Sequence, residues 1–148
     1  MQIVVATLFI ALIPASSLMP VGAFVAVADA QTPAPTGQSL ADAATFGAVA
    51  TLAPLCGLRD EAWSRDLRRA AAQTATGSAA TDDAGLARVP GNGQVAAALG
   101  YGDMEALEDF AADTPAATCA SLRGNPALGR ADAAVAAFRR RRDGKPVG

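Results

Sequence analysis

The sequence predicts an all-α fold, a small bundle of about five helices with one disulfide, and two observations support this prediction. Small and apolar residues recur at helical spacing through most of the chain after residue 30. The alternating β-branched residues that build strands are scarce there, since no isoleucine follows residue 30. Residues 31–148 contain only 21 large apolar side chains, so we expect one domain with a thin core, over residues 39–143.

The first 30 residues form a segment of their own, with no charged side chain before Asp29. An apolar run over residues 3–13 is followed by Pro14, and Ala28-Asp29-Ala30 has the small residues of a signal-peptide cleavage site. The segment therefore predicts a cleaved signal peptide and a periplasmic or secreted protein. No lysine or arginine precedes the apolar run, so an uncleaved anchor that holds the chain at a membrane is the alternative.

The polar, proline-containing residues 31–38 are expected to form a flexible, disordered leader. We expect the first helix to begin at Ser39, which together with Asp42 resembles a capping box. Apolar residues then recur at helical spacing as far as Cys56, and Gly57 is a natural helix stop.

The second helix is expected to follow Asp60, a favourable N-cap, and to end at Gly77. Trp63 lies on its apolar face, and a single tryptophan in such a position is more often part of the core than of a ligand site. The opposite face is charged, and two intrahelical pairs are expected on it, Glu61 with Arg65 and Asp66 with Arg69.

Residues 77–93 are rich in turn formers and are expected to loop over the surface.

Residues 94–99 and 103–112 are helical by propensity, and we expect Gly100-Tyr101-Gly102 to break or kink the helix between them, because an interior glycine costs about 1 kcal/mol. Tyr101 between two glycines is a candidate for contact with a partner. The second piece is expected to bury Met104, Leu107, Phe110 and Ala111.

Two helix starts near the C-terminus are sharply marked. Thr114-Pro115 and Asn125-Pro126 each place a capping side chain before a proline that suits the first helical position. The first predicts a short helix ending at Gly124. The second predicts a longer helix, followed by a short tail over residues 144–148, with a buried stripe of Leu128, Ala131, Val135 and Phe138.

Cys56 and Cys119 are the only cysteines, and an even number in an exported chain predicts a disulfide. The bond would close a loop of about 64 residues and stabilise the fold by about 4 kcal/mol on the chain-entropy model. Two buried free thiols are the alternative. A redox pair is disfavoured because the Cys-x-x-Cys spacing is missing.

The composition disfavours an enzyme. The chain has no histidine, which excludes histidine-dependent triads and histidine-ligated zinc or haem, and its only lysine is Lys145 in the tail. We expect no cofactor and no metal. Five acidic residues between 103 and 113 are interpreted as a solvated helix face rather than as a carboxylate pair or a calcium site, namely Asp103, Glu105, Glu108, Asp109 and Asp113.

Four consecutive arginines are expected at the end of the last helix, where they suit the helix dipole and could also bind carboxylate or phosphate groups.

The leading hypothesis is that the protein has a non-enzymatic function in the cell envelope, either macromolecular binding or an accessory or structural role. The partner would be an envelope protein or an anionic envelope surface, and nucleic acid is disfavoured. The alternative is a small-molecule carrier or sensor with a pocket between helices near Trp63 and Tyr101. The candidate partner-binding residues are Arg139, Arg140, Arg141, Arg142, Trp63 and Tyr101.

Overall fold

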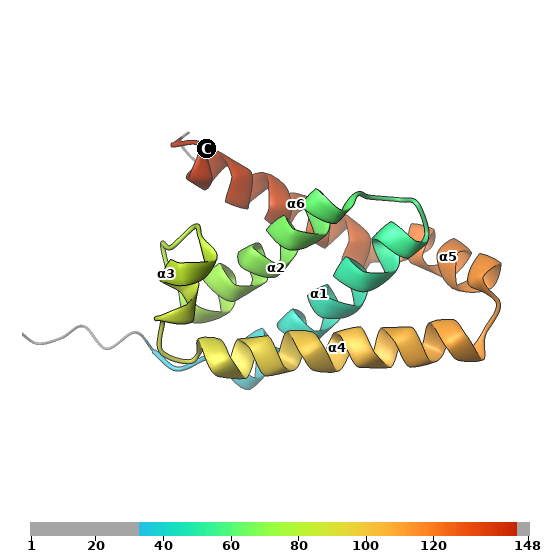
Figure 1. Ribbon diagram of the computed structural model, residues 1–148, viewed down its shortest axis with the longest axis horizontal. Helices are drawn as coiled ribbons and strands as arrows, with labels where there is room; N and C mark the ends of the chain where they lie inside the picture. Colours follow the sequence, from blue (N-terminus) through green and yellow to red (C-terminus); the bar gives the residue numbers. More distant parts are fainter. Residues whose placement is uncertain (1–32, 145–148) are drawn as a thin grey trace, which may run out of the picture. The chain divides into compact units, whose positions relative to one another are not determined.

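The computed structural model describes residues 33–144, which form six α-helices and no strand (Figure 1). The helices are α1 (Gly37–Leu55), α2 (Glu61–Thr76), α3 (Asp83–Ala87), α4 (Asn92–Ala112), α5 (Pro115–Gly124) and α6 (Pro126–Arg142). The all-α fold predicted from the sequence is confirmed. The segment expected to be a signal peptide or an anchor lies outside the described residues, as do Gln31, Thr32 and residues 145–148.

Helix α1 contacts α2, α4, α5 and α6, and α2 packs in turn on α4 and α6 (Figure 1). The core has two parts. One gathers Trp63 and Leu67 of α2 against α1, α5 and α6, and the other joins α1, α2, α3 and α4 around Val95 and Leu99. Trp63 is 6% exposed, so its assignment to the core is confirmed, and the stripe predicted for α6 is buried in full. None of the helices in the described residues combines the length and the hydropathy needed to cross a bilayer.

Helix α4 is continuous from Asn92 to Ala112, so the break predicted at Gly100–Gly102 is wrong. The reason is the close approach of α1. A Cβ atom on Gly102 would lie 1.8 Å from the carbonyl oxygen of Ala44, and one on Gly47 would lie 2.2 Å from the carbonyl oxygen of Leu99. The two glycines therefore let the helix backbones touch, and the packing gained offsets their low helix propensity.

The stripe predicted to be buried on α4 is also wrong. Met104 and Leu107 are 55% and 50% exposed, Phe110 is half-buried and Ala111 is exposed. Because the glycine side of α4 faces α1, small residues occupy the contact and the larger ones point outward. The buried residues of α4 are Val95, Leu99, Gly102 and Ala106.

The first helix begins two residues earlier than expected. Thr36 is its N-cap, and the Thr36 hydroxyl accepts a hydrogen bond from the Ser39 N–H at 3.1 Å. The capping box predicted at Ser39 is therefore wrong, and so is the disorder predicted for Gly37 and Gln38, which are helical. The other predicted caps are confirmed, and they are Asp60 for α2, Thr114 for α5 and Asn125 for α6.

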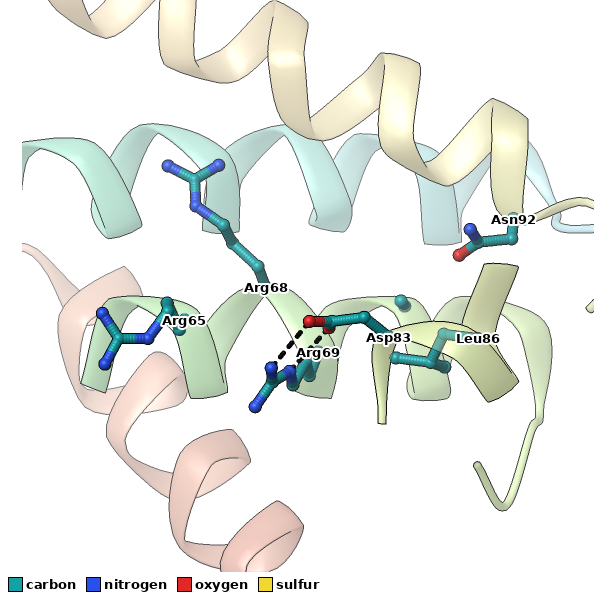
Figure 2. Close-up of a pocket in the computed structure, with 7 residues that line it drawn as sticks. Arg65, Arg68, Arg69, Asp83, Leu86 and Asn92 are labelled. Atoms are coloured by element: carbon teal, nitrogen blue, oxygen red, sulfur yellow. Dashed lines mark hydrogen bonds and ion pairs between the residues drawn. The ribbon is translucent and has the colours of Figure 1, made fainter. Parts of the chain in front are cut away.

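The segment predicted as a loop over 77–93 contains the short helix α3, which the turn-rich composition did not reveal. Asp82 caps α3, and Leu86 is buried against the core. An ion pair between Arg69 of α2 and Asp83 of α3, drawn in Figure 2, also holds this segment in place.

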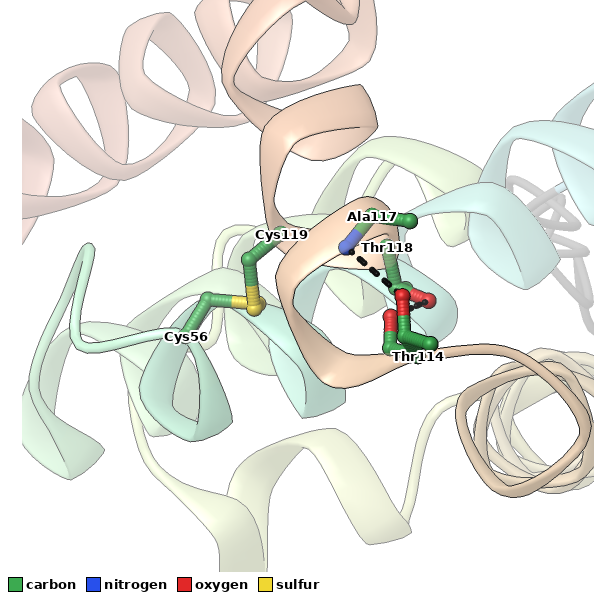
Figure 3. Close-up of a disulfide and its surroundings, with 5 residues drawn as sticks. All are labelled: Cys56, Thr114, Ala117, Thr118 and Cys119. Atoms are coloured by element: carbon green, nitrogen blue, oxygen red, sulfur yellow. Dashed lines mark hydrogen bonds between the residues drawn. A yellow bond between two sulfur atoms is a disulfide. The ribbon is translucent and has the colours of Figure 1, made fainter.

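The predicted disulfide between Cys56 and Cys119 is confirmed (Figure 3). The Cα atoms of the two cysteines are 5.3 Å apart, and the bond joins the C-cap of α1 to the middle of α5. Helix α5 buries only Leu122. A helix with so little buried apolar area gains little from packing, so the disulfide is a main reason for its position.

Candidate binding face

The arginine run at the end of α6 lies against α2 and is not simply a solvated helix end. Arg139 Nε donates a hydrogen bond to the carboxylate of Asp66 at 2.7 Å, and Arg142 lies 3.5 Å from the same carboxylate. Arg141 donates to Oε1 of Gln73 at 2.8 Å. Asp66 and Gln73 are both buried residues of α2. Three of the four arginines therefore help to hold α6 on α2.

Arg140 differs from the other members of the run. Its side chain is exposed, and it makes no hydrogen bond or ion pair with any residue between 33 and 144. Phe138, two residues earlier, is fully buried and fixes this end of α6 to the core.

A second group of arginines extends from α2, with the spacing that places residues on one helix face (Figure 2). Arg69 holds Asp83 with two hydrogen bonds of 2.7 Å, and Arg68 lies 2.6 Å from the carboxylate of Asp103 on α4. Arg65 is exposed and has no hydrogen bond or ion pair in the described part of the chain. The sequence did not single out this group as a candidate binding surface.

Both intrahelical pairs predicted on α2 are wrong. Asp66 pairs with Arg139 of α6 instead of Arg69, and no ion pair joins Glu61 to Arg65. Arginines and carboxylates of α2 find partners on α3, α4 and α6, because bidentate pairing across helices is stronger than an exposed pair along one helix.

The two arginine groups lie on α2 and α6, which pack on each other. The hydrogen bond from Arg69 lowers the pKa of the Asp83 carboxyl, and the pKa of Arg69 is raised, first by that hydrogen bond and further by the charges of Asp83 and Asp66. Asp66 also pairs with two arginines of α6. We call this surface the arginine face, and it consists of Arg65, Arg68, Arg69, Arg139, Arg141 and Arg142.

Two hollows adjoin the arginine face, and Arg65 and Arg68 line both. One, of about 320 Å³, is also lined by Arg69, Asp83 and Asn92 (Figure 2). The other, of about 300 Å³, is lined by Leu55 and Leu107, which are 53% and 50% exposed. We call the two hollows together the α2 groove. It has guanidinium groups in its middle and exposed apolar side chains at one end.

The residues proposed for a pocket between helices lie in different surroundings. Tyr101 is 59% exposed on α4, whereas Trp63 is buried and donates its indole N–H to Asp132 at 3.1 Å. Neither residue lines the α2 groove. A further hollow of about 480 Å³ carries Asp109 and Asp113 of the acidic half of α4, and it includes neither aromatic residue.

The surroundings of Trp63 are those of a structural cluster. Arg59 lies 5.8 Å from the centre of the Trp63 ring, and its Nε donates to Asp132 at 2.8 Å. Hydrogen bonds from Arg59 lower the pKa of the Asp132 carboxyl, burial opposes this shift, and the Trp63 N–H adds to it. The cluster ties the segment after α1 to α2 and α6.

The carboxylates of α4 are not gathered into a site. Asp103 accepts hydrogen bonds from Arg68 and, at 2.9 Å, from the Thr51 hydroxyl, whereas Glu105 and Glu108 are exposed. Among residues 33–144, no group of three or more cysteine, aspartate or glutamate side chains could hold a metal ion. The charged feature with the clearest organisation is therefore the arginine face.

The chain matches no family model, and no curated protein or solved structure is significantly similar to it.

Proposed function

We propose that the chain is an exported, non-enzymatic protein that binds a negatively charged macromolecule of the cell envelope through the arginine face. The main support is that two groups of arginines, far apart in the sequence, lie on helices that pack together. Arg139 and Arg142 of α6 bind Asp66 of α2, the helix that carries Arg65, Arg68 and Arg69. The ion pairs of the face use four carboxylates, those of Asp66, Asp83, Asp103 and Asp143, against six guanidinium groups. Arg65 and Arg141 have no carboxylate partner among residues 33–144, so their charges are left unpaired there.

Guanidinium groups suit this role because they bind carboxylate and phosphate groups through two parallel hydrogen bonds and keep their charge at every physiological pH. Arg69 already holds the carboxylate of Asp83 in this way. Arg65 is exposed and has no such partner among the described residues, so it is the arginine of this face most open to an incoming anion.

A periplasmic or secreted location is part of the proposal. The disulfide supports it, because such bonds form and persist in oxidising compartments. The uncharged N-terminal residues 1–28 support it independently as a signal peptide. If that segment is retained as an anchor, the arginine face would act beside the membrane that holds it.

The proposal is tested by sedimenting the purified chain with washed envelopes of its host. Arg65→Glu combined with Arg142→Gln removes charge from the arginine face. The matched control, Arg123→Glu combined with Arg130→Gln, makes the same change in net charge at exposed positions outside the face. Both variants should keep the circular dichroism of the wild type, since Arg65 has no partner among residues 33–144 and Asp66 retains Arg139, which lies closer to it than Arg142 does.

The wild type and the control should sediment with the envelopes at low salt and be released at high salt, because exposed charges are screened. The variant of the arginine face should stay in the supernatant. If this variant sediments like the wild type, or if the control is lost to the same degree, the arginine face is not the binding surface.

A further inference from the structure

We propose that the α2 groove binds an extended, acidic segment of a partner protein, with a carboxylate of that segment at Arg65 and an apolar side chain between Leu55 and Leu107. This inference rests on the proposed function and names the chemistry of the partner. It follows from the two hollows on either side of Arg65 and from the difference in their lining.

The basic part of the groove determines the charge of the partner. Arg65, Arg68 and Arg69 all line the hollow of about 320 Å³, and Asp83 is the only carboxylate among the described residues that line it. Arg68 and Arg69 already hold carboxylates of this chain, which demonstrates the pairing geometry, and the guanidinium of Arg65 beside them has no partner within residues 33–144. A carboxylate of a partner segment would pair with Arg65 in the same way.

The apolar part of the groove indicates that the partner segment also carries an apolar side chain. Leu55 and Leu107 come from α1 and α4 and line the same hollow, and each is about half exposed. Pro54 and Ala50 add to its apolar lining. Glu61 lines this hollow as well and would repel an acidic group here. The end near the leucines therefore suits an apolar side chain, and the carboxylate belongs on the other side of Arg65.

The form of the groove favours a peptide segment over a membrane surface. Each hollow is at the lower end of the size range of ligand pockets, so the pair suits successive side chains better than one large molecule. The headgroups of a flat bilayer cannot enter two hollows that share a wall of arginine side chains. A second copy of this chain, docking with the acidic half of its α4, is the other protein occupant to be tested.

The experiment measures fluorescence anisotropy of labelled peptides added to the full, disulfide-bonded chain. One peptide alternates glutamate with leucine, a second has serine for every leucine, and a third has glutamine for every glutamate. Vesicles of phosphatidylglycerol provide the membrane probe, and light scattering reports the mass of the chain alone.

The glutamate and leucine peptide should bind, and each altered peptide should bind at least about fivefold more weakly, because charged hydrogen bonds and a buried leucine each contribute more than 1 kcal/mol. Arg65→Glu and Leu107→Ser should each weaken binding by a similar factor. Arg123→Glu and Met104→Ser, changes of the same kind at residues that do not line the groove, should leave it unchanged. All four residues are exposed, so the variants should fold.

Equal binding of the serine peptide, or binding of vesicles but of no peptide, would overturn the inference. A dimer of the wild type that Leu107→Ser dissociates would assign the groove to a second copy and would also overturn it. These results leave the proposed function standing if Arg65→Glu with Arg142→Gln still abolishes envelope association. If that association does not depend on the arginine face, the proposed function itself fails.

Discussion

Replacement of Gly102 by alanine should destabilise the fold far more than a single methyl group ordinarily does. The new Cβ would lie 1.8 Å from the carbonyl oxygen of Ala44, and Cβ atoms essentially never come within 3.0 Å of another group. The obstacle is helix backbone, so no side chain can rotate away and α1 and α4 must separate by roughly 1 Å or more. Overpacking of a well-packed core costs about 1–3 kcal/mol, and a backbone contact belongs at the upper end, at about 3 kcal/mol.

Gly100 provides a matched control two residues away on the same helix. A Cβ on Gly100 meets no atom within 4 Å. Gly100→Ala should therefore raise the free energy of unfolding by about 0.5–1 kcal/mol, through higher helix propensity alone. Both variants gain this helix propensity, so they should differ in stability by about 3 kcal/mol, the cost of the backbone contact, with opposite signs relative to the wild type.

Urea denaturation followed by circular dichroism measures both changes, and the midpoints should shift in opposite directions at an unchanged slope. A Gly102→Ala variant as stable as the wild type would refute the backbone contact between α1 and α4. A Gly100→Ala variant that is clearly destabilised would refute the conclusion that a Cβ atom at this position of α4 meets no other group.

Three further predictions concern the bonds between helices. Cys56→Ser with Cys119→Ser should lower the free energy of unfolding in urea by about 4 kcal/mol, and a loss below about 1 kcal/mol would contradict the loop-closure estimate. The pKa of the Asp132 carboxyl is lowered in the folded state, so its stabilising contribution is present above about pH 4 and is lost as the pH falls through the lower folded value. Asp132→Asn should therefore reduce the melting temperature more near pH 7 than near pH 2, whereas an equal reduction at both values would argue against the ion pair. Arg139→Ala should cost about 1–2 kcal/mol, because it deprives a buried carboxylate of its closest partner, while Arg140→Ala should change stability by less than about 0.5 kcal/mol. Equal melting temperatures of these two variants would contradict the ion pair between α6 and Asp66 of α2.

The features that the sequence predicted correctly depend on neighbouring residues. Asp60, Thr114 and Asn125 cap helices because their side chains bond to backbone N–H groups two or three residues further along. The pairing of Cys56 with Cys119 was predictable because the chain has no other cysteine. These signals require no knowledge of which helices meet.

Helix α4 could not be predicted in the same way. Gly102 reduces helix propensity locally, and only the approach of Ala44 from α1 explains why a glycine is needed there. Because the side of α4 that carries Gly102 packs on α1, Met104 and Leu107 lie on the exposed side of the helix. A stripe of large apolar residues is thus a poor guide to the buried side of a helix whose contact uses small ones.

The arginine face was partly predictable. The run that includes Arg139 was recognised as a candidate surface, but its pairing with Asp66 depends on how α6 crosses α2. The contribution of Arg65 was hidden because spacing along α2 favoured an intrahelical partner, Glu61, which it does not pair with. Ion pairs between helices follow from the tertiary arrangement and have no signature in local spacing.

Modification of arginine side chains by phenylglyoxal, located by mass spectrometry, tests the arginine face most directly and needs no variant. The wild-type chain is treated alone and when bound to envelopes of its host. Arg65 should lose reactivity on binding, while Arg123 and Arg130, exposed outside the face, should react at the same rate in both states. Unchanged reactivity of Arg65 in the bound chain, or equal protection of all three residues, would contradict binding through the arginine face.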